Sequence, residues 1–264
     1  MSALNYPIGI ALHGGALYVV DLGNSVVEKI SGGTLSIVAG IPGKSGNPTP
    51  GPATQSMLRS PIGVAVDATG NIYIADQGIQ FGQSNVVEKI STGGTLSIFA
   101  GEVAASGYAT PGPATQSMLN YPQGVAVDGR GNVYIADMNQ VIEKVTTRGM
   151  LSIFAGVQGG TGTPTPGPAT QSHFNDPNGV ATDAYGNVYV ADSGNDRIEK
   201  ISSGVLSFFA GNGSRGAAIP GLATSSMLNL PVTMAAAGRS VYIADTYNNS
   251  IDKVTGGVLS IFAG

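Results

Sequence analysis

Short apolar runs separated by turn residues recur along the whole chain. Residues 119–156 contain four of them, at 124–128, 132–137, 141–145 and 151–156, each rich in Val, Ile, Tyr or Phe. Such runs favour β-strands, and the Gly-Asn turn between the first two is typical of a tight hairpin. Because no sustained helical period occurs, the pattern predicts an all-β protein.

This four-strand unit is repeated five times. The repeats begin at Leu4, Leu58, Leu119, Phe174 and Leu228, and they occupy 4–57, 58–118, 119–173, 174–227 and 228–264. They fill the chain, which predicts a single repeat domain over residues 1–264. Four antiparallel strands per repeat are typical of the blades of a β-propeller. A β-solenoid is the competing fold, but its parallel strands would not be joined by tight hairpins.

The connector between repeats is copied as well. It reads GPATQSM at 51–57 and 112–118, GPATQSH at 167–173 and GLATSSM at 221–227. We predict a single helical turn capped by Thr and Ser, followed by a methionine that fills the gap between neighbouring blades. The third copy has His173 in the methionine position.

The repeat itself resembles a known family. The motif P-x-G-V-A-V-D-x-x-G-N-V-Y-I-A-D-x-x-N-x-x-I-E-K-V is similar to the NHL repeat, and repeats 2, 3 and 4 match it closely. Repeat 1 has His13 in place of the first Asp, whereas repeat 5 has Thr233 for Gly and Ala237 for that Asp. The connector resembles those of bacterial NHL arrays. The resemblance implies a propeller fold, and NHL propellers include protein-binding, RNA-binding, sensor and a few lyase or lactonase domains, so function must be argued from the site.

NHL propellers often have six blades, whereas five repeats are present in this chain. We therefore expect either a five-bladed ring, closed by blade 1 against blade 5, or part of a six-bladed or oligomeric ring. The protein is then a monomer or a ring-completing oligomer. Residues 2–5 align with the end of a connector, which favours a domain of a longer protein; in a bacterium, it would be secreted or extracytoplasmic.

The amino-acid composition limits the classes of partner that the protein is expected to bind. Charged residues make up 11% of the chain and the net charge is −4, so there is no basic excess of the kind that nucleic-acid binding requires. No apolar run reaches the length of a membrane span. The sequence thus predicts neither a nucleic-acid partner nor membrane insertion.

Comparison of the five copies separates scaffold acids from candidate site residues. Thirteen of the sixteen acids recur at equivalent positions, at the ends of the first and second strands and before a Lys on the third strand. A residue present in most copies serves the blade, and Asp in a turn accepts backbone N–H groups. The acids outside this pattern are Glu102, Asp176 and Asp196.

A binding site is expected where the connectors reach the first strand of each blade and where the second strand turns into the third. These segments share one face, which we call the connector face, and an insertion at 78–85 lengthens one of its turns. Loops on a rigid scaffold are the usual place for binding residues. The candidates are Tyr6, Tyr121, Gln123, His173, Asp176, Asn178, Asp196, Arg197 and Tyr247, with most of the unusual polar residues in repeat 4. The alternative is that these are solvated loop residues with surface pairing such as Asp176–Arg197.

The chemistry available to such a site is limited. His13 and His173 are the only histidines, and the predicted strands place them on opposite faces, so they cannot share a zinc ion. No nucleophile-elbow motif is present. We expect no cofactor, with Ca²⁺ bound by oxygen ligands as the alternative. The sequence favours a non-enzymatic recognition or scaffold module that binds a protein, a peptide or a carbohydrate; the alternatives are an NHL-type lyase or hydrolase with its site in repeat 4, and a structural repeat without a site.

Overall fold

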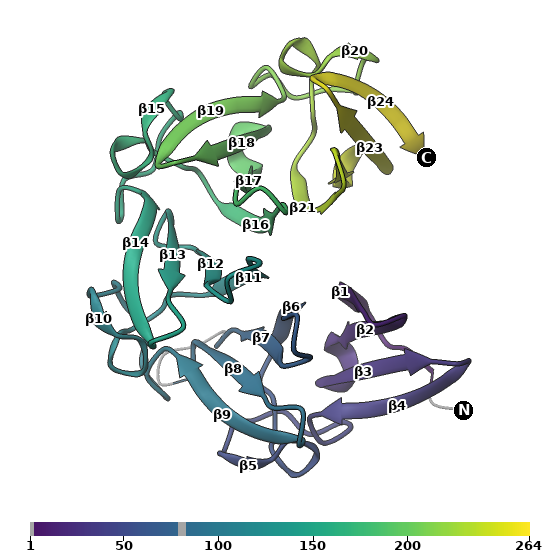
Figure 1. Cartoon of the computed structure of the whole chain (residues 1–264), viewed down its shortest axis with the longest axis vertical. Helices are drawn as coiled ribbons and strands as arrows, with labels where there is room; N and C mark the ends of the chain where they lie inside the picture. Colours follow the sequence, from purple (N-terminus) through teal and green to yellow (C-terminus); the bar gives the residue numbers. More distant parts are fainter. Residues whose placement is uncertain (1–2, 79–82) are drawn as a thin grey trace. The chain divides into compact units, whose positions relative to one another are not determined.

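The computed structural model describes residues 3–78 and 83–264, so part of the predicted insertion, residues 79–82, lies outside the described chain. Each sequence repeat forms one antiparallel sheet, and we number the sheets as blades 1 to 5 in chain order (Figure 1). The chain divides into two compact units. The N-terminal unit comprises residues 1–135 and 144–152, and the C-terminal unit comprises residues 136–143 and 153–264. Blade 3 contributes strands to both units.

The strands coincide with the predicted apolar runs. Blade 1 contains β1 (Pro7–His13), β2 (Ala16–Asp21), β3 (Val26–Ser31) and β4 (Thr34–Ala39). Blade 2 contains β6 (Pro61–Val66), β7 (Ile72–Asp76), β8 (Val86–Ile90) and β9 (Thr95–Ala100). Blade 3 contains β11 (Pro122–Val127), β12 (Val133–Asp137), β13 (Val141–Val145) and β14 (Met150–Gly156).

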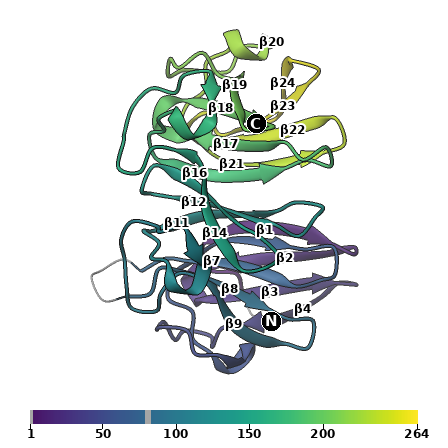
Figure 2. The same cartoon turned by 60° about the vertical axis from the view of Figure 1, so that its left-hand side comes forward.

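The last two repeats follow the same order. Blade 4 contains β16 (Pro177–Thr182), β17 (Val188–Asp192), β18 (Arg197–Ser202) and β19 (Val205–Ala210), with β16, β17 and β18 beside one another in Figure 2. Blade 5 contains β21 (Pro231–Ala237), β22 (Ser240–Asp245), β23 (Ser250–Thr255) and β24 (Val258–Ala263). Five antiparallel sheets in sequence confirm the predicted five-bladed β-propeller. Among the described residues, no helix has the length and apolar character that a membrane crossing requires.

The connectors contain more structure than expected. Their Gly-Pro or Gly-Leu pairs form two-residue strands, β5 (Gly51–Pro52), β10 (Gly112–Pro113), β15 (Gly167–Pro168) and β20 (Gly221–Leu222). Each pairs with the outermost strand of the blade that follows it and so adds a fifth strand to blades 2 to 5. The predicted helical turns are present as 3₁₀ turns at η2 (Ala53–Gln55), η3 (Ala114–Gln116), η4 (Ala169–Gln171) and η6 (Ala223–Ser225).

The serine in the copied connector explains why this stretch is repeated. Ser56 is buried, and its Oγ accepts the N–H of Thr49 at 2.9 Å. Ser117, Ser172 and Ser226 accept the equivalent N–H group at 2.8 to 3.0 Å. A buried N–H group without a partner is costly, so the same serine is needed at each joint between blades. The hydroxyl therefore ties down the connector, whereas the sequence had suggested a helix cap.

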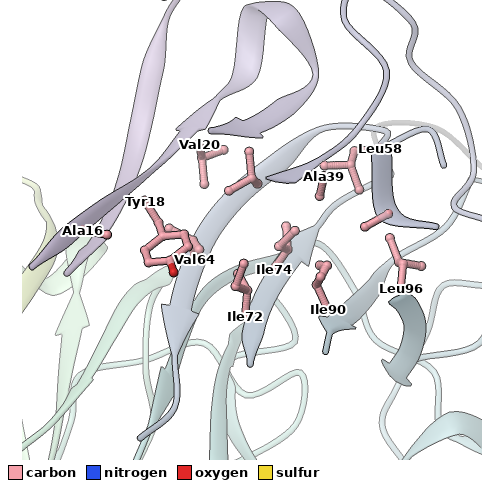
Figure 3. Packing of buried hydrophobic residues seen from close by; sticks show 12 residues of the cluster. Ala16, Tyr18, Val20, Ala39, Leu58, Val64, Ile72, Ile74, Ile90 and Leu96 are labelled. Carbon is pink, nitrogen blue, oxygen red and sulfur yellow. The ribbon is translucent and has the colours of Figure 1, made fainter. Parts of the chain in front are cut away.

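The hydrophobic core lies between successive blades. In the N-terminal unit, Tyr18 and Val20 of blade 1 pack against a cluster on blade 2 that includes Ile74 and Leu96 (Figure 3). Each fully buried aliphatic side chain contributes about 1.5 to 3 kcal/mol relative to its exposed state. Both faces of such a strand are covered by protein, which is why the blades lack a clean alternation of apolar and polar residues.

Candidate functional site

The connector face is built on backbone conformations that recur from blade to blade. The residue before the proline of the first strand has a left-handed φ in four blades, at Tyr6 (57°), Tyr121 (51°), Asp176 (54°) and Leu230 (51°). At Tyr121, Asp176 and Leu230, this residue donates its N–H to a side chain of the preceding blade. Within the N-terminal unit, the Tyr121 N–H donates to Asn85 Oδ1 at 2.9 Å. These bonds make the loops of the connector face part of the joint between blades.

Asp196 has this joint-forming role in the C-terminal unit. Its side chain is buried, and Oδ1 accepts the N–H of Leu230 at 2.8 Å, just as Gln140 Oε1 accepts that of Asp176. Arg215 Nε lies 3.2 Å from Asp196 Oδ2. Comparison of the copies did not find this role because Asn, Gln and Asp all act as the acceptor, so the residue type varies while the function in the joint stays the same.

Arg197 does not pair with Asp176. Its guanidinium lies over the ring of Phe208, 4.2 Å from the centroid, and Nη1 donates to the carbonyl of Gly211 at 3.1 Å. Nη2 donates to the carbonyl of Asn212. The suggested Asp176–Arg197 surface pair is therefore wrong, because the carbonyls that end blade 4 occupy the guanidinium.

His173 packs as the methionines do in the other copies. Met57 contacts Gly46, and Met227 contacts Gly216; the half-buried His173 lies in the same way against the equivalent Gly162, and its ring also contacts Gly160. Its Nδ1 is 2.7 Å from the carbonyl oxygen of Gly160. Since a carbonyl only accepts, Nδ1 is protonated and donates, and the imidazole anchors the connector.

The candidates that remain open to solvent in the C-terminal unit come from blades 4 and 5. Asp176 is exposed, and Asn178 donates from Nδ2 to the Asp176 carbonyl at 3.2 Å. Tyr247 lies in the 3₁₀ turn η7 (Thr246–Asn248), and 67% of its surface is exposed. The turn after β17 links the two blades, since Ser193 donates its N–H to the Asp176 carbonyl and its hydroxyl to the carbonyl of Pro231. We refer to Asp176, Asn178 and Tyr247, the candidates of this unit on the connector face, together as the blade 4–5 patch.

The N-terminal unit presents its own candidates on the same face of its blades. Tyr6 is 70% exposed, whereas Tyr121 is partly buried. Gln123 donates from Nε2 to Gln77 Oε1 of blade 2 at 2.9 Å and to the Tyr121 carbonyl at 3.3 Å. An amide side chain pairs two blades here, so Gln123 is held in place and its neighbours remain accessible.

The recurrent acids form buried carboxyl pairs. In blade 4, Asp192 accepts the N–H of Asn175 and the side-chain amide of Asn195, both at 2.7 Å. Glu199 is fully buried, and neither of its carboxyl oxygens has a hydrogen-bond partner in the described chain. Burial, followed by the charge on Asp192, raises the pKa of Glu199 well above its usual value. Burial likewise raises the pKa of Asp192 to about 7, against the hydrogen bonds from its two Asn partners.

The same pair recurs in other blades. Burial and the charge on a neighbouring Asp raise the pKa of Glu88, Glu143 and Asp252. Each of these acids is buried on the third strand of its blade. The repeated pairs are enclosed within the blades, in agreement with the scaffold role that the sequence comparison predicts. No group of three or more His, Cys, Asp or Glu side chains in the described chain is arranged to hold a metal ion.

Comparison with known proteins agrees with this architecture. Residues 174–201 match the NHL repeat family, and a search of curated protein sequences finds no significant match. A nidogen–laminin complex is similar to the chain with 20% identity and a TM-score of 0.66, covering 99% of this chain and 81% of the other.

Two lyases have the same fold. A streptogramin B lyase is 13% identical with a TM-score of 0.58, covering 100% of this chain and 85% of the lyase. Virginiamycin B lyase from Staphylococcus aureus is 11% identical with a TM-score of 0.57, covering 98% and 84%. At these identities the similarity establishes the fold alone.

Proposed function

Because the chain is a β-propeller of the NHL-repeat type, we propose that it is a non-enzymatic recognition module that binds a protein or peptide partner on its connector face. The blade 4–5 patch is the proposed contact in the C-terminal unit. Tyr6, Tyr121 and Gln123 are the proposed contacts in the N-terminal unit.

The observation that carries this proposal is a large exposed aromatic side chain on a fixed turn. Tyr247 is 67% exposed, and its own N–H donates to the Asn229 carbonyl at 3.1 Å. Tyrosine is enriched among the residues that dominate binding at protein interfaces. A turn already held by hydrogen bonds loses little conformational entropy on binding, which favours affinity.

The polar candidates of the same unit suit a peptide. Asp176 offers an exposed carboxylate, and the Asn178 side chain lies beside it with an amide that donates and accepts. His173, Asp196 and Arg197 hold the connector and the turns in place, so we assign them a positioning role. The fold-level likeness to a nidogen–laminin complex supports a protein partner, since a propeller of this fold occurs there in a protein assembly.

The commitment of the acids to the scaffold supports a non-enzymatic role. Asp192 has both oxygens in hydrogen bonds to connector and turn groups, and Glu199 beside it is fully buried. A general acid or base must reach a substrate proton within hydrogen-bond distance. These pairs are enclosed by their own blades, where a substrate cannot reach them.

The test begins with peptides selected from a random display library against the immobilised protein. Their dissociation constants are then measured for the wild type and for Tyr247→Ala and Asp176→Ala. We expect losses of at least tenfold for Tyr247→Ala, because truncation of an aromatic anchor removes most of its buried contact. Tyr185→Ala is the matched control, since Tyr185 is 72% exposed in the same unit but lies in the β16–β17 hairpin, at the opposite end of the strands.

Two results would overturn the proposal. One is that the selected peptides bind Tyr247→Ala and Asp176→Ala as tightly as the wild type. The other is that their binding depends on Tyr185 instead. A glycan array run in parallel tests whether the partner is a carbohydrate instead. Glycan binding on this patch without any peptide binding would contradict a protein partner.

A further inference from the structure

Two clefts open at the hairpin ends of the blades, away from the connector face. One lies in the N-terminal unit between blades 2 and 3 and has a volume of about 350 Å³. The other lies in the C-terminal unit between blades 4 and 5 and has a volume of about 360 Å³. Both volumes fall within the range of small-molecule binding sites.

The two clefts have the same aromatic wall. In the first, the rings of Tyr73 and Phe99 meet edge to face with centroids 4.9 Å apart; in the second, Tyr189 and Phe209 do so at 4.8 Å. Each tyrosine hydroxyl donates to the Asp that ends the first strand of its blade, at 3.2 Å and 3.1 Å. The tyrosine rings are thus fixed but only 3% and 5% exposed, so the partly buried Phe99 and Phe209 provide the apolar surface of the clefts.

Each cleft also holds two cations. Lys89 and Lys200 lie over the tyrosine rings, with Nζ 5.5 Å and 5.9 Å from the centroids. Arg130 and Arg239 reach the clefts from the first hairpin of the following blade. None of these four side chains forms an ion pair within the described residues.

The aspartate side chains that line the clefts already accept hydrogen bonds from their own hairpins. Asp67 Oδ1 accepts the N–H groups of Thr69 and Asn71, both at 2.9 Å, and Oδ2 accepts the Asn71 side-chain amide at 2.7 Å. Burial works against these bonds, but together they lower the pKa of Asp67 to about 2. Asp183 makes the corresponding bonds in the second cleft. Their oxygens close the hairpins, which leaves the lysine and arginine available to an external anion.

A third joint shows that these features are not imposed by the fold. Where blades 1 and 2 meet, Tyr18 and Lys29 are present with the same cation–π contact at 5.6 Å. Val38 and Thr69 stand there in place of the phenylalanine and the arginine. The second aromatic ring and the second cation are therefore additions to a common scaffold.

We propose that each cleft binds a uronic acid, either as the free sugar or as a residue of an acidic polysaccharide. The carboxylate would lie between the lysine and the arginine, which form charge-assisted hydrogen bonds with carboxylates. The apolar face of the sugar ring would pack on the phenylalanine, which the buried tyrosine holds in place. The hydroxyls would meet polar groups of the hairpins, Thr69 in the first cleft and Asn187 in the second.

The test is a calorimetric titration of the full chain with sodium glucuronate. We expect two sites per chain with dissociation constants in the millimolar range or tighter, and at least tenfold weaker binding of glucose and of acetate. Glucose tests the carboxylate and acetate tests the sugar ring. A diuronate compared with free glucuronate distinguishes the source, since tighter binding of the diuronate identifies a polysaccharide.

Substitutions in each cleft show which cleft accounts for which binding site. Arg130→Gln and Arg239→Gln should each remove one of the two sites, and the double variant should abolish binding. Lys44→Gln, an exposed cation outside both clefts, should retain two sites. The proposal is overturned if glucuronate does not bind, if glucose binds equally well, or if the double variant binds like the wild type. None of these results bears on the peptide test at the blade 4–5 patch, so the two proposals fail separately.

Discussion

Replacement of Glu199 by Gln should change how the stability of the protein depends on pH. Glu199 is fully buried beside Asp192, and both carboxyl groups have raised pKa values, with Asp192 at about 7. In the unfolded chain both groups ionise near their ordinary values, about 4. The folded pair therefore keeps a proton that the unfolded chain releases, over the window from about pH 4 to about pH 7.

The sign follows from proton linkage. The unfolded state binds fewer protons in this window, so the free energy of unfolding falls as pH rises. The slope is about 1.4 kcal/mol per pH unit for each retained proton, and the loss between pH 5 and pH 7 is about 3 kcal/mol for one pair. The stabilisation is complete below about pH 4 and disappears as pH rises through the folded-state pKa values.

Glutamine has the shape of the protonated acid but does not ionise. Glu199→Gln should leave the stability unchanged near pH 4 and raise it by up to about 3 kcal/mol at pH 7. The measurement is urea unfolding of both proteins from pH 4 to pH 8. The matched control is Glu102→Gln, an exposed connector acid whose replacement should leave the slope as it is. Parallel curves for Glu199→Gln and the wild type would refute the reasoning.

Three further predictions concern the joints between blades, each measured as a change in unfolding free energy. Leu58→Ala should lower the free energy of unfolding by about 2 to 5 kcal/mol, because Leu58 is fully buried. Leu4 is the equivalent residue of the first repeat and is 42% exposed, so Leu4→Ala should cost less than about 1 kcal/mol. Equal losses for the two variants would contradict the burial argument. Ser172→Ala should cost about 1 to 3 kcal/mol, since the Thr165 N–H loses its acceptor, and an unchanged midpoint argues against this role. His173→Met restores the packing of the other copies and should change stability by less than about 1 kcal/mol; a loss above about 2 shows that the imidazole bond matters more than we infer.

The blade itself could be predicted from the sequence because its determinants are local. Short apolar runs and Gly-Asn hairpins act over a few residues, and the predicted strands coincide with those observed. The turn Asp that closes the first hairpin, as at Asp67, also acts on residues two and four positions away. Comparison of the copies identified the acids that recur, because one structural need recurs at one position of each repeat, but it left out Asp196, whose role in the joint is filled by Asn or Gln in other copies.

The candidate site was harder because it depends on partners about 35 residues or more away. The sequence marked Asp196 as unusual, but only the structure shows that it accepts the N–H of Leu230 in the next blade. The repeated arginine at one hairpin position, Arg130 and Arg239, was the available signal for the clefts, yet its meaning requires the wall of the preceding blade.

The sequence by itself determined the blade: four strands, their hairpins, and a connector whose serine recurs at each joint and whose methionine recurs at three of the four. Only the tertiary structure decided which residues pack against each face of a blade. Alternation along a strand fixes which side chains share a face, but it carries no information on the chain that covers that face. In this protein that cover is the next repeat, a whole blade further along the chain, so the inter-blade hydrogen bonds, the added strand at each connector and the two clefts exist only once the blades have packed.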